Sequence, residues 1–105
     1  MDIKEVMDFI KWESERLKKN FQTDDKERLL ARTVKIGEEY GELCDDILAF
    51  RNLQRRQKMG QRKIEDLHEE VIDVILVTLL LAEELGIDVE SEIRKKIEKV
   101  REREY

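Results

Sequence analysis

Apolar residues recur every three or four positions along four stretches of the chain, the spacing of an amphipathic α-helix. The stretches are residues 2–20, 25–58, 62–85 and 89–103. As a single helix the second would be about 50 Å long, at ~1.5 Å per residue, so we expect a break between residues 50 and 57. The pattern predicts an all-α fold of four helices with short connections, arranged as an antiparallel bundle-like domain.

Capping residues and glycines separate these stretches. Thr23 or Asp24 is placed to cap the second helix, and Gly60 is the natural stop after it. Gly86 suits the left-handed position that ends the third helix, and Asp88 is placed to cap the fourth. The connections are therefore predicted at the same places as the breaks in the apolar pattern.

The composition narrows the class of protein. With 105 residues, no proline and four glycines, the chain is predicted to form one domain over residues 1–105 and not a turn-rich β-fold. The longest apolar run, residues 71–82, is shorter than the ~20 residues that span a bilayer, so we expect no membrane association. Cys44 is the only cysteine, and residues 1–13 lack the apolar segment of a signal peptide, which together predict a cytoplasmic protein. The net charge of −5 disfavours a nucleic-acid partner.

Acidic residues occur in two groups at helical spacing. The groups are Glu38, Glu39 and Glu42 in the second helix, and Glu70 and Asp73 in the third. Residues 71–82 are apolar nearly all round, which predicts a buried third helix with Asp73 in a place that holds little water. An unpaired buried carboxylate costs several kcal/mol, so Asp73 should meet a cation or stay protonated.

Packed against each other, the two groups would form an all-oxygen site suited to Mg²⁺ or Mn²⁺, which leaves positions for phosphate oxygens. Two alternatives stay open: a solvated face for the first group, and a buried Arg or Lys as the partner of the second. Gly37 and Gly41 flank Glu38 and Glu39 and suggest close approach of another helix or of a ligand, or simply tight helix packing.

Residues 35–43 read KIGEEYGEL and residues 70–73 read EVID, which is an EExxE motif followed by ExxD. This pair resembles the MazG-like all-α nucleoside triphosphate pyrophosphohydrolases. Residues 85–88, LGID, followed by a basic final helix, are similar to the same family. The resemblance covers the chain from about residue 31 to its C-terminus.

The resemblance implies Mg²⁺-dependent hydrolysis of a (deoxy)nucleoside triphosphate to the monophosphate and pyrophosphate, by a homodimer or homotetramer. It implies that the metal ligands are Glu39, Glu42, Glu70 and Asp73. Glu38 would hold a further metal ion or help to activate the attacking water. Lys99 and Arg103 of the last helix would contact phosphates, although an asparagine common in that segment is replaced here by Ile97 or Val100.

Candidates for phosphate contact taken from the residues themselves are Lys35, Arg51, Lys99 and Arg103. Trp12 is expected in the core, with stacking on a base as the alternative. Two other functions remain open. Phosphoribosyl-ATP pyrophosphohydrolases share the first motif, but their second usually continues with an aromatic–His step, whereas Val74 and Ile75 follow Asp73 here. The other alternative is a non-enzymatic helical oligomerisation module.

Overall fold

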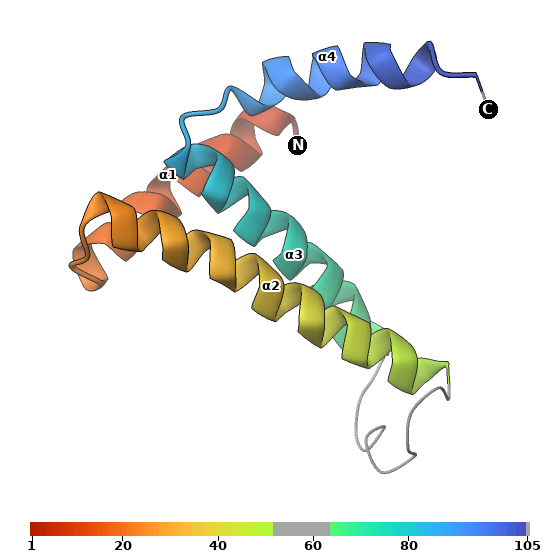
Figure 1. Ribbon diagram of the computed structural model, residues 1–105, viewed down its shortest axis with the longest axis horizontal. Coiled ribbons are helices and arrows are strands. Elements are labelled where there is room, and N and C mark those ends of the chain that lie inside the picture. Colours follow the sequence, from red (N-terminus) through yellow and green to blue (C-terminus); the bar gives the residue numbers. More distant parts are fainter. Residues whose placement is uncertain (52–63, 105) are drawn as a thin grey trace.

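The computed structural model describes residues 1–51 and 64–104 and shows four helices (Figure 1). They are α1 (Ile3–Asn20), α2 (Asp25–Phe50), α3 (Ile64–Glu84) and α4 (Val89–Arg101). No strand occurs within the described residues. The all-α class and the number of helices predicted from the apolar pattern are confirmed.

Side-chain caps begin three of the helices. Asp24, and not Thr23, accepts a hydrogen bond from the backbone N–H of Glu27 at 2.8 Å at the start of α2. Asp88 accepts from the backbone N–H of Ser91 at 3.1 Å at the start of α4. Asp2, which the sequence analysis did not single out, caps α1 in the same way. These bonds satisfy N–H groups that have no partner in the first turn of a helix.

The helix ends also agree with the predicted breaks. Gly86 has φ of +69°, the left-handed conformation that glycine adopts at little cost, and it follows the last turn of α3. The helix α2 ends at Phe50, inside the window predicted for a break. The predicted stop at Gly60 lies outside the described residues.

The helices α2 and α3 run antiparallel, side by side, and α1 packs across α3 behind this pair (Figure 1). The helix α4 packs chiefly against α1 and extends away from the α2–α3 pair, so the four helices form an open arrangement. The radius of gyration is 16.8 Å, against about 13 Å for a compact domain of this length. The chain by itself therefore leaves several helix faces uncovered.

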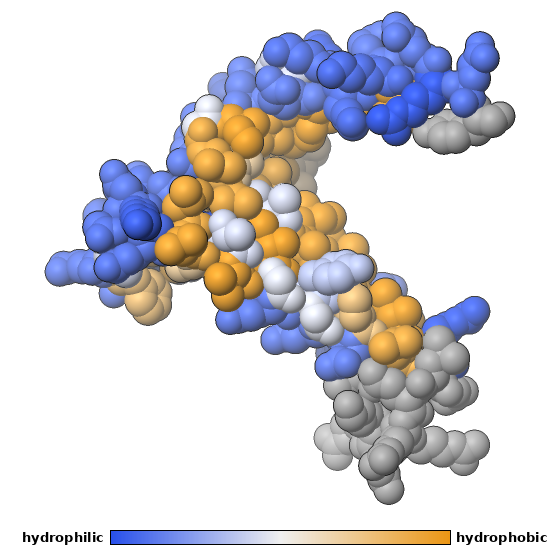
Figure 2. Space-filling model, in the orientation of Figure 1, coloured by the Kyte–Doolittle hydropathy of each residue, from blue (hydrophilic) through white to orange (hydrophobic). Residues whose placement is uncertain are grey.

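The core of the single chain is small. Among the described residues, the buried apolar side chains are Ile10, Ala49 and Val89. No residue of α3 is buried, so the prediction of a buried third helix is wrong for the single chain. The reason is that α1 and α2 cover only part of its apolar circumference, and Ile72 remains 51% exposed. Figure 2 shows hydrophobic residues gathered along the visible face of α3.

The surroundings of Gly37 and Gly41 are open. A Cβ added at Gly37 or Gly41 would meet no side chain within 4 Å, so no part of the described chain approaches these glycines closely. The expectation of close helix packing at Gly37 and Gly41 is therefore wrong for the single chain.

Across residues 1–51 and 64–104, no helix has an apolar stretch long enough to cross a membrane.

Candidate metal centre

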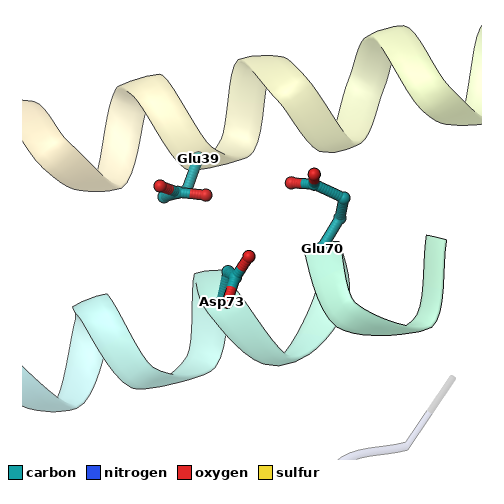
Figure 3. A group of neighbouring side chains, drawn as sticks. All are labelled: Glu39, Glu70 and Asp73. Carbon is teal, nitrogen blue, oxygen red and sulfur yellow. The ribbon is translucent and has the colours of Figure 1, made fainter. Parts of the chain in front are cut away.

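Three carboxylates meet between α2 and α3. Glu39 projects from α2, and Glu70 and Asp73 project toward it from successive turns of α3 (Figure 3). One carboxylate oxygen from each residue lies within 4.8 Å of the other two. The structure therefore brings together three of the four residues for which the resemblance implied a role as metal ligands.

The three side chains differ in their access to water. Glu39 is only 9% exposed, and Oε2 of Glu70 is buried without a hydrogen-bond partner. Asp73 is exposed, so the prediction that it is removed from water is wrong. The carboxylates with little access to water are instead those of Glu39 and Glu70, because these two side chains lie deeper between the helices.

The electrostatic environment disfavours a charged Glu70. Burial raises the pKa of the Glu70 carboxyl above its ordinary value, and the nearby charges of Glu42, Asp46, Asp73 and Glu39 raise it further. A group of like charges that includes a buried oxygen without a hydrogen bond is unfavourable by itself. A bound divalent cation would offset the repulsion between the carboxylates and give the buried oxygen a partner.

Glu42, the fourth implied ligand, lies one turn further along α2. It lines a neighbouring hollow together with Glu70 and three aspartates that the sequence analysis did not select: Asp45, Asp46 and Asp66. Each of these aspartates takes part in polar or electrostatic interactions. Asp46 is 7% exposed, and its spacing of seven residues from Glu39 places both on one helix face, which is the signal that could have identified it.

Lys35 is the basic residue that contacts the first motif. Its Nζ lies 3.3 Å from Oε1 of Glu39 and 3.5 Å from Oε2 of Glu38. The hydrogen bond that Lys35 donates to Glu39 is the main cause of the raised pKa of Lys35, which stays charged. Glu38 is otherwise turned toward solvent, with its side chain 58% exposed.

The other phosphate candidates lie elsewhere in this chain. Arg51 is at the C-terminal cap of α2. Lys99 is on α4 and Arg103 follows it, and this helix extends away from the α2–α3 pair that carries the acids (Figure 1). Within one chain, these residues are not brought to the acidic cluster.

The donor set fits a hard divalent cation. All the donors are carboxylate oxygens, which suit Mg²⁺ or Mn²⁺ better than Zn²⁺ or copper. The buried Oε2 of Glu70 has no hydrogen bond that an ion would have to displace. Glu39, Glu70 and Asp73 are therefore the residues that would hold such an ion, with Glu42 beside them.

Comparison with known proteins identifies the family. A family model described as the MazG-like family matches residues 30–104, more than half of the chain. The matched region includes every acid of the candidate centre. Neither the curated proteins nor the solved structures contain a match to the chain. On the strength of the family match, the chain belongs to the MazG-like family.

Proposed function

We propose that the protein is a Mg²⁺-dependent nucleotide pyrophosphohydrolase that cleaves a (deoxy)nucleoside triphosphate to the monophosphate and pyrophosphate. The observation that carries this proposal is the convergence of Glu39, Glu70 and Asp73 between two antiparallel helices. Membership of the MazG-like family supports it, because that family suggests a fold of the nucleotide pyrophosphohydrolase type.

In this proposal Glu39, Glu70 and Asp73 hold the cation, and Glu42 completes the set from the neighbouring turn. A bound Mg²⁺ supplies positive charge for the phosphate oxygens and favours deprotonation of water. Lys35 restrains the carboxylate of Glu39 through its ion pair. Glu38, whose carboxylate is open to solvent, takes the proton of the water that attacks the α-phosphorus. Water adds across the bond between the α- and β-phosphates, and pyrophosphate leaves.

The proposal extends to a homodimer or homotetramer. The apolar side chains of Val71, Ile72 and Ile75 on α3 are each more than 40% exposed, which is unusual for three neighbouring residues of one helix. A second copy would cover them. A change of Ile75→Glu should lower the mass measured by light scattering, whereas an unchanged mass would place the subunit interface elsewhere. A cytoplasmic setting remains an expectation.

The decisive experiment measures pyrophosphate release from a panel of nucleoside triphosphates, with and without Mg²⁺. We expect metal-dependent formation of monophosphate and pyrophosphate in equal amounts. Release of orthophosphate would contradict the proposed site of cleavage. Preference for phosphoribosyl-ATP in the same panel would move the function to that alternative. No cleavage, together with no rise of the melting temperature on adding Mg²⁺, would favour the helical oligomerisation module.

A further inference from the structure

The helix α1 forms one wall of a second hollow beside the acids. Glu39 and Asp73 line this hollow from α2 and α3, and Glu13 and Arg16 line it from α1. The remaining lining is apolar, and the volume is about 290 Å³. Arg16 is the basic side chain among the lining residues, so a cation lies across a cavity from two of the carboxylates that would hold the metal.

The guanidinium of Arg16 is held at its face and at one nitrogen. Its Cζ lies 4.7 Å from the centroid of the Trp12 ring, and Nη2 lies 2.5 Å from Oε2 of Glu13. Trp12 in turn lies 5.9 Å from the ring of Phe9 and is 56% exposed, which contradicts the expectation that it is a core residue. Stacking occupies the face of a guanidinium but leaves its in-plane N–H groups free.

The side chain of Arg16 remains 54% exposed although it makes both contacts. A guanidinium has five N–H donors, and the pair with Glu13 engages only one of its nitrogens. Arg16 is therefore held in position and still accessible to a ligand. This combination distinguishes it from Lys35, which is tied to Glu38 and to Glu39 of the centre itself.

We propose that Arg16 binds the phosphate chain of the substrate across the hollow from Glu39 and Asp73. The inference rests on the proposed function, since it assumes that a polyphosphate approaches the acidic centre. Such a chain carries more negative charge than one divalent ion cancels, and a planar guanidinium can donate two parallel hydrogen bonds to phosphate oxygens. Arg16 is thus assigned to a substrate contact that the sequence motifs did not indicate.

A purely structural role would leave phosphate binding unchanged. The pair of Glu13 and Arg16 has the i,i+3 spacing of ion pairs that stabilise a helix slightly. The chain offers a matched control for this role on the same helix. Lys18 pairs with Glu15 at the same spacing, with 3.3 Å between Nζ and Oε1, and does not line the hollow.

The experiment compares the full-length protein with its R16Q, R16K and K18Q variants. Calorimetry measures binding of inorganic tripolyphosphate in the presence of Mg²⁺, and binding of Mn²⁺ alone is measured in parallel. We expect R16Q to weaken tripolyphosphate binding about 10- to 100-fold, the effect of losing ionic hydrogen bonds, without changing Mn²⁺ affinity. R16K should lie between R16Q and the wild type, and K18Q should stay within about twofold of the wild type.

Several results would count against phosphate binding by Arg16. Unchanged tripolyphosphate affinity in R16Q, or equal losses in R16Q and K18Q, would overturn the inference. A loss of Mn²⁺ affinity in R16Q would also overturn it, because Arg16 would then act through the acidic centre. If R16Q fails to fold, the R16K variant decides, and wild-type affinity in that variant counts against Arg16.

Steady-state kinetics separate this inference from the proposed function. We expect R16Q to raise KM for a nucleoside triphosphate more than it lowers kcat. A wild-type protein that binds tripolyphosphate through Arg16 but cleaves no nucleotide would contradict the proposed function and leave the inference standing. Nucleotide cleavage that does not depend on Arg16 would support the proposed function and contradict the inference about Arg16.

Discussion

The interface between α2 and α3 holds carboxylates at two places, with opposite electrostatic outcomes. Near the start of α2, Nε of Arg28 lies 2.5 Å from Oε1 of Glu84, and the two side chains are only 12% and 11% exposed. In the middle of the interface, Glu39, Glu70 and Asp73 converge, and Oε2 of Glu70 has no hydrogen-bond partner. The same pair of helices therefore carries one charge-matched contact and one group of like charges.

The pKa shifts show the same contrast. The hydrogen bond that Arg28 donates to Glu84, and then the one it donates to Asp25, raises the pKa of Arg28, so the fold favours its charged form. Burial and four nearby carboxylates raise the pKa of Glu70, so the fold disfavours its charged form. The first contact stabilises the helix pair without help, while the second is favourable only with a cation or a proton. A site that costs stability in the free protein is a candidate for ligand binding.

The largest expected effect comes from removing charge in the middle of the interface. The double change Glu39→Gln and Asp73→Asn keeps the shape of both side chains but removes two of the three anionic donors. We expect Mg²⁺-dependent pyrophosphate release to fall at least about 1,000-fold, in line with the loss of charge stabilisation in other active sites. The Mg²⁺-dependent rise in melting temperature should disappear as well.

The matched control for this variant is Glu98→Gln combined with Asp8→Asn, which makes the same chemical changes at exposed positions outside the centre. Circular dichroism would establish that the helices remain. Activity of the Glu39→Gln/Asp73→Asn protein equal to that of the wild type would remove the central carboxylates from catalysis.

The next effect concerns the charge-matched contact. Replacing Arg28 by Met leaves Glu84 largely buried without its cation, so we expect the melting temperature to fall by several degrees. Activity per folded molecule and Mg²⁺ affinity should stay near those of the wild type. Thermal unfolding and calorimetry measure both properties. A large loss of Mg²⁺ affinity with little loss of stability would mean that the two places are not independent.

Much of the fold could be predicted from the sequence because its signals are local. The caps Asp24 and Asp88 and the left-handed Gly86 lie where spacing along the chain predicts them. The meeting of Glu39 with Glu70 could also be anticipated, since both motifs fall on long helices that were expected to run antiparallel.

The contacts and exposures that the sequence did not predict depend on how the helices are placed in space. Arg28 and Glu84 are 56 residues apart, and no local pattern indicates that they meet. The exposure of Asp73 depends on which side of α3 is covered, and the apolar circumference of that helix did not specify one. Arg16 lines the site because α1 crosses α3, and this crossing is a property of packing between helices distant in sequence.

A smaller effect is expected from neutralising Glu70 alone. Glu70→Gln removes the charge that the fold disfavours, so the metal-free variant should melt a few degrees above the wild type at neutral pH. The same variant should gain less from added Mg²⁺, because one donor has lost its charge. Glu65→Gln, an exposed change on the same helix, serves as the control. A metal-free Glu70→Gln protein that melts below the wild type would show that the charged carboxylate is satisfied.

The smallest expected effect is the pH dependence of the difference in melting temperature between metal-free Glu70→Gln and the wild type. Because the folded state raises the pKa of Glu70 above its ordinary 4.5, the folded protein binds this proton more tightly than the unfolded chain does. The destabilisation is therefore complete above the raised pKa and is relieved as the pH falls through it toward 4.5. The gap in melting temperature between metal-free Glu70→Gln and the wild type should shrink over this interval. A gap that stays constant from neutral pH down to pH 4.5 would assign the stabilisation to the amide and not to the lost charge.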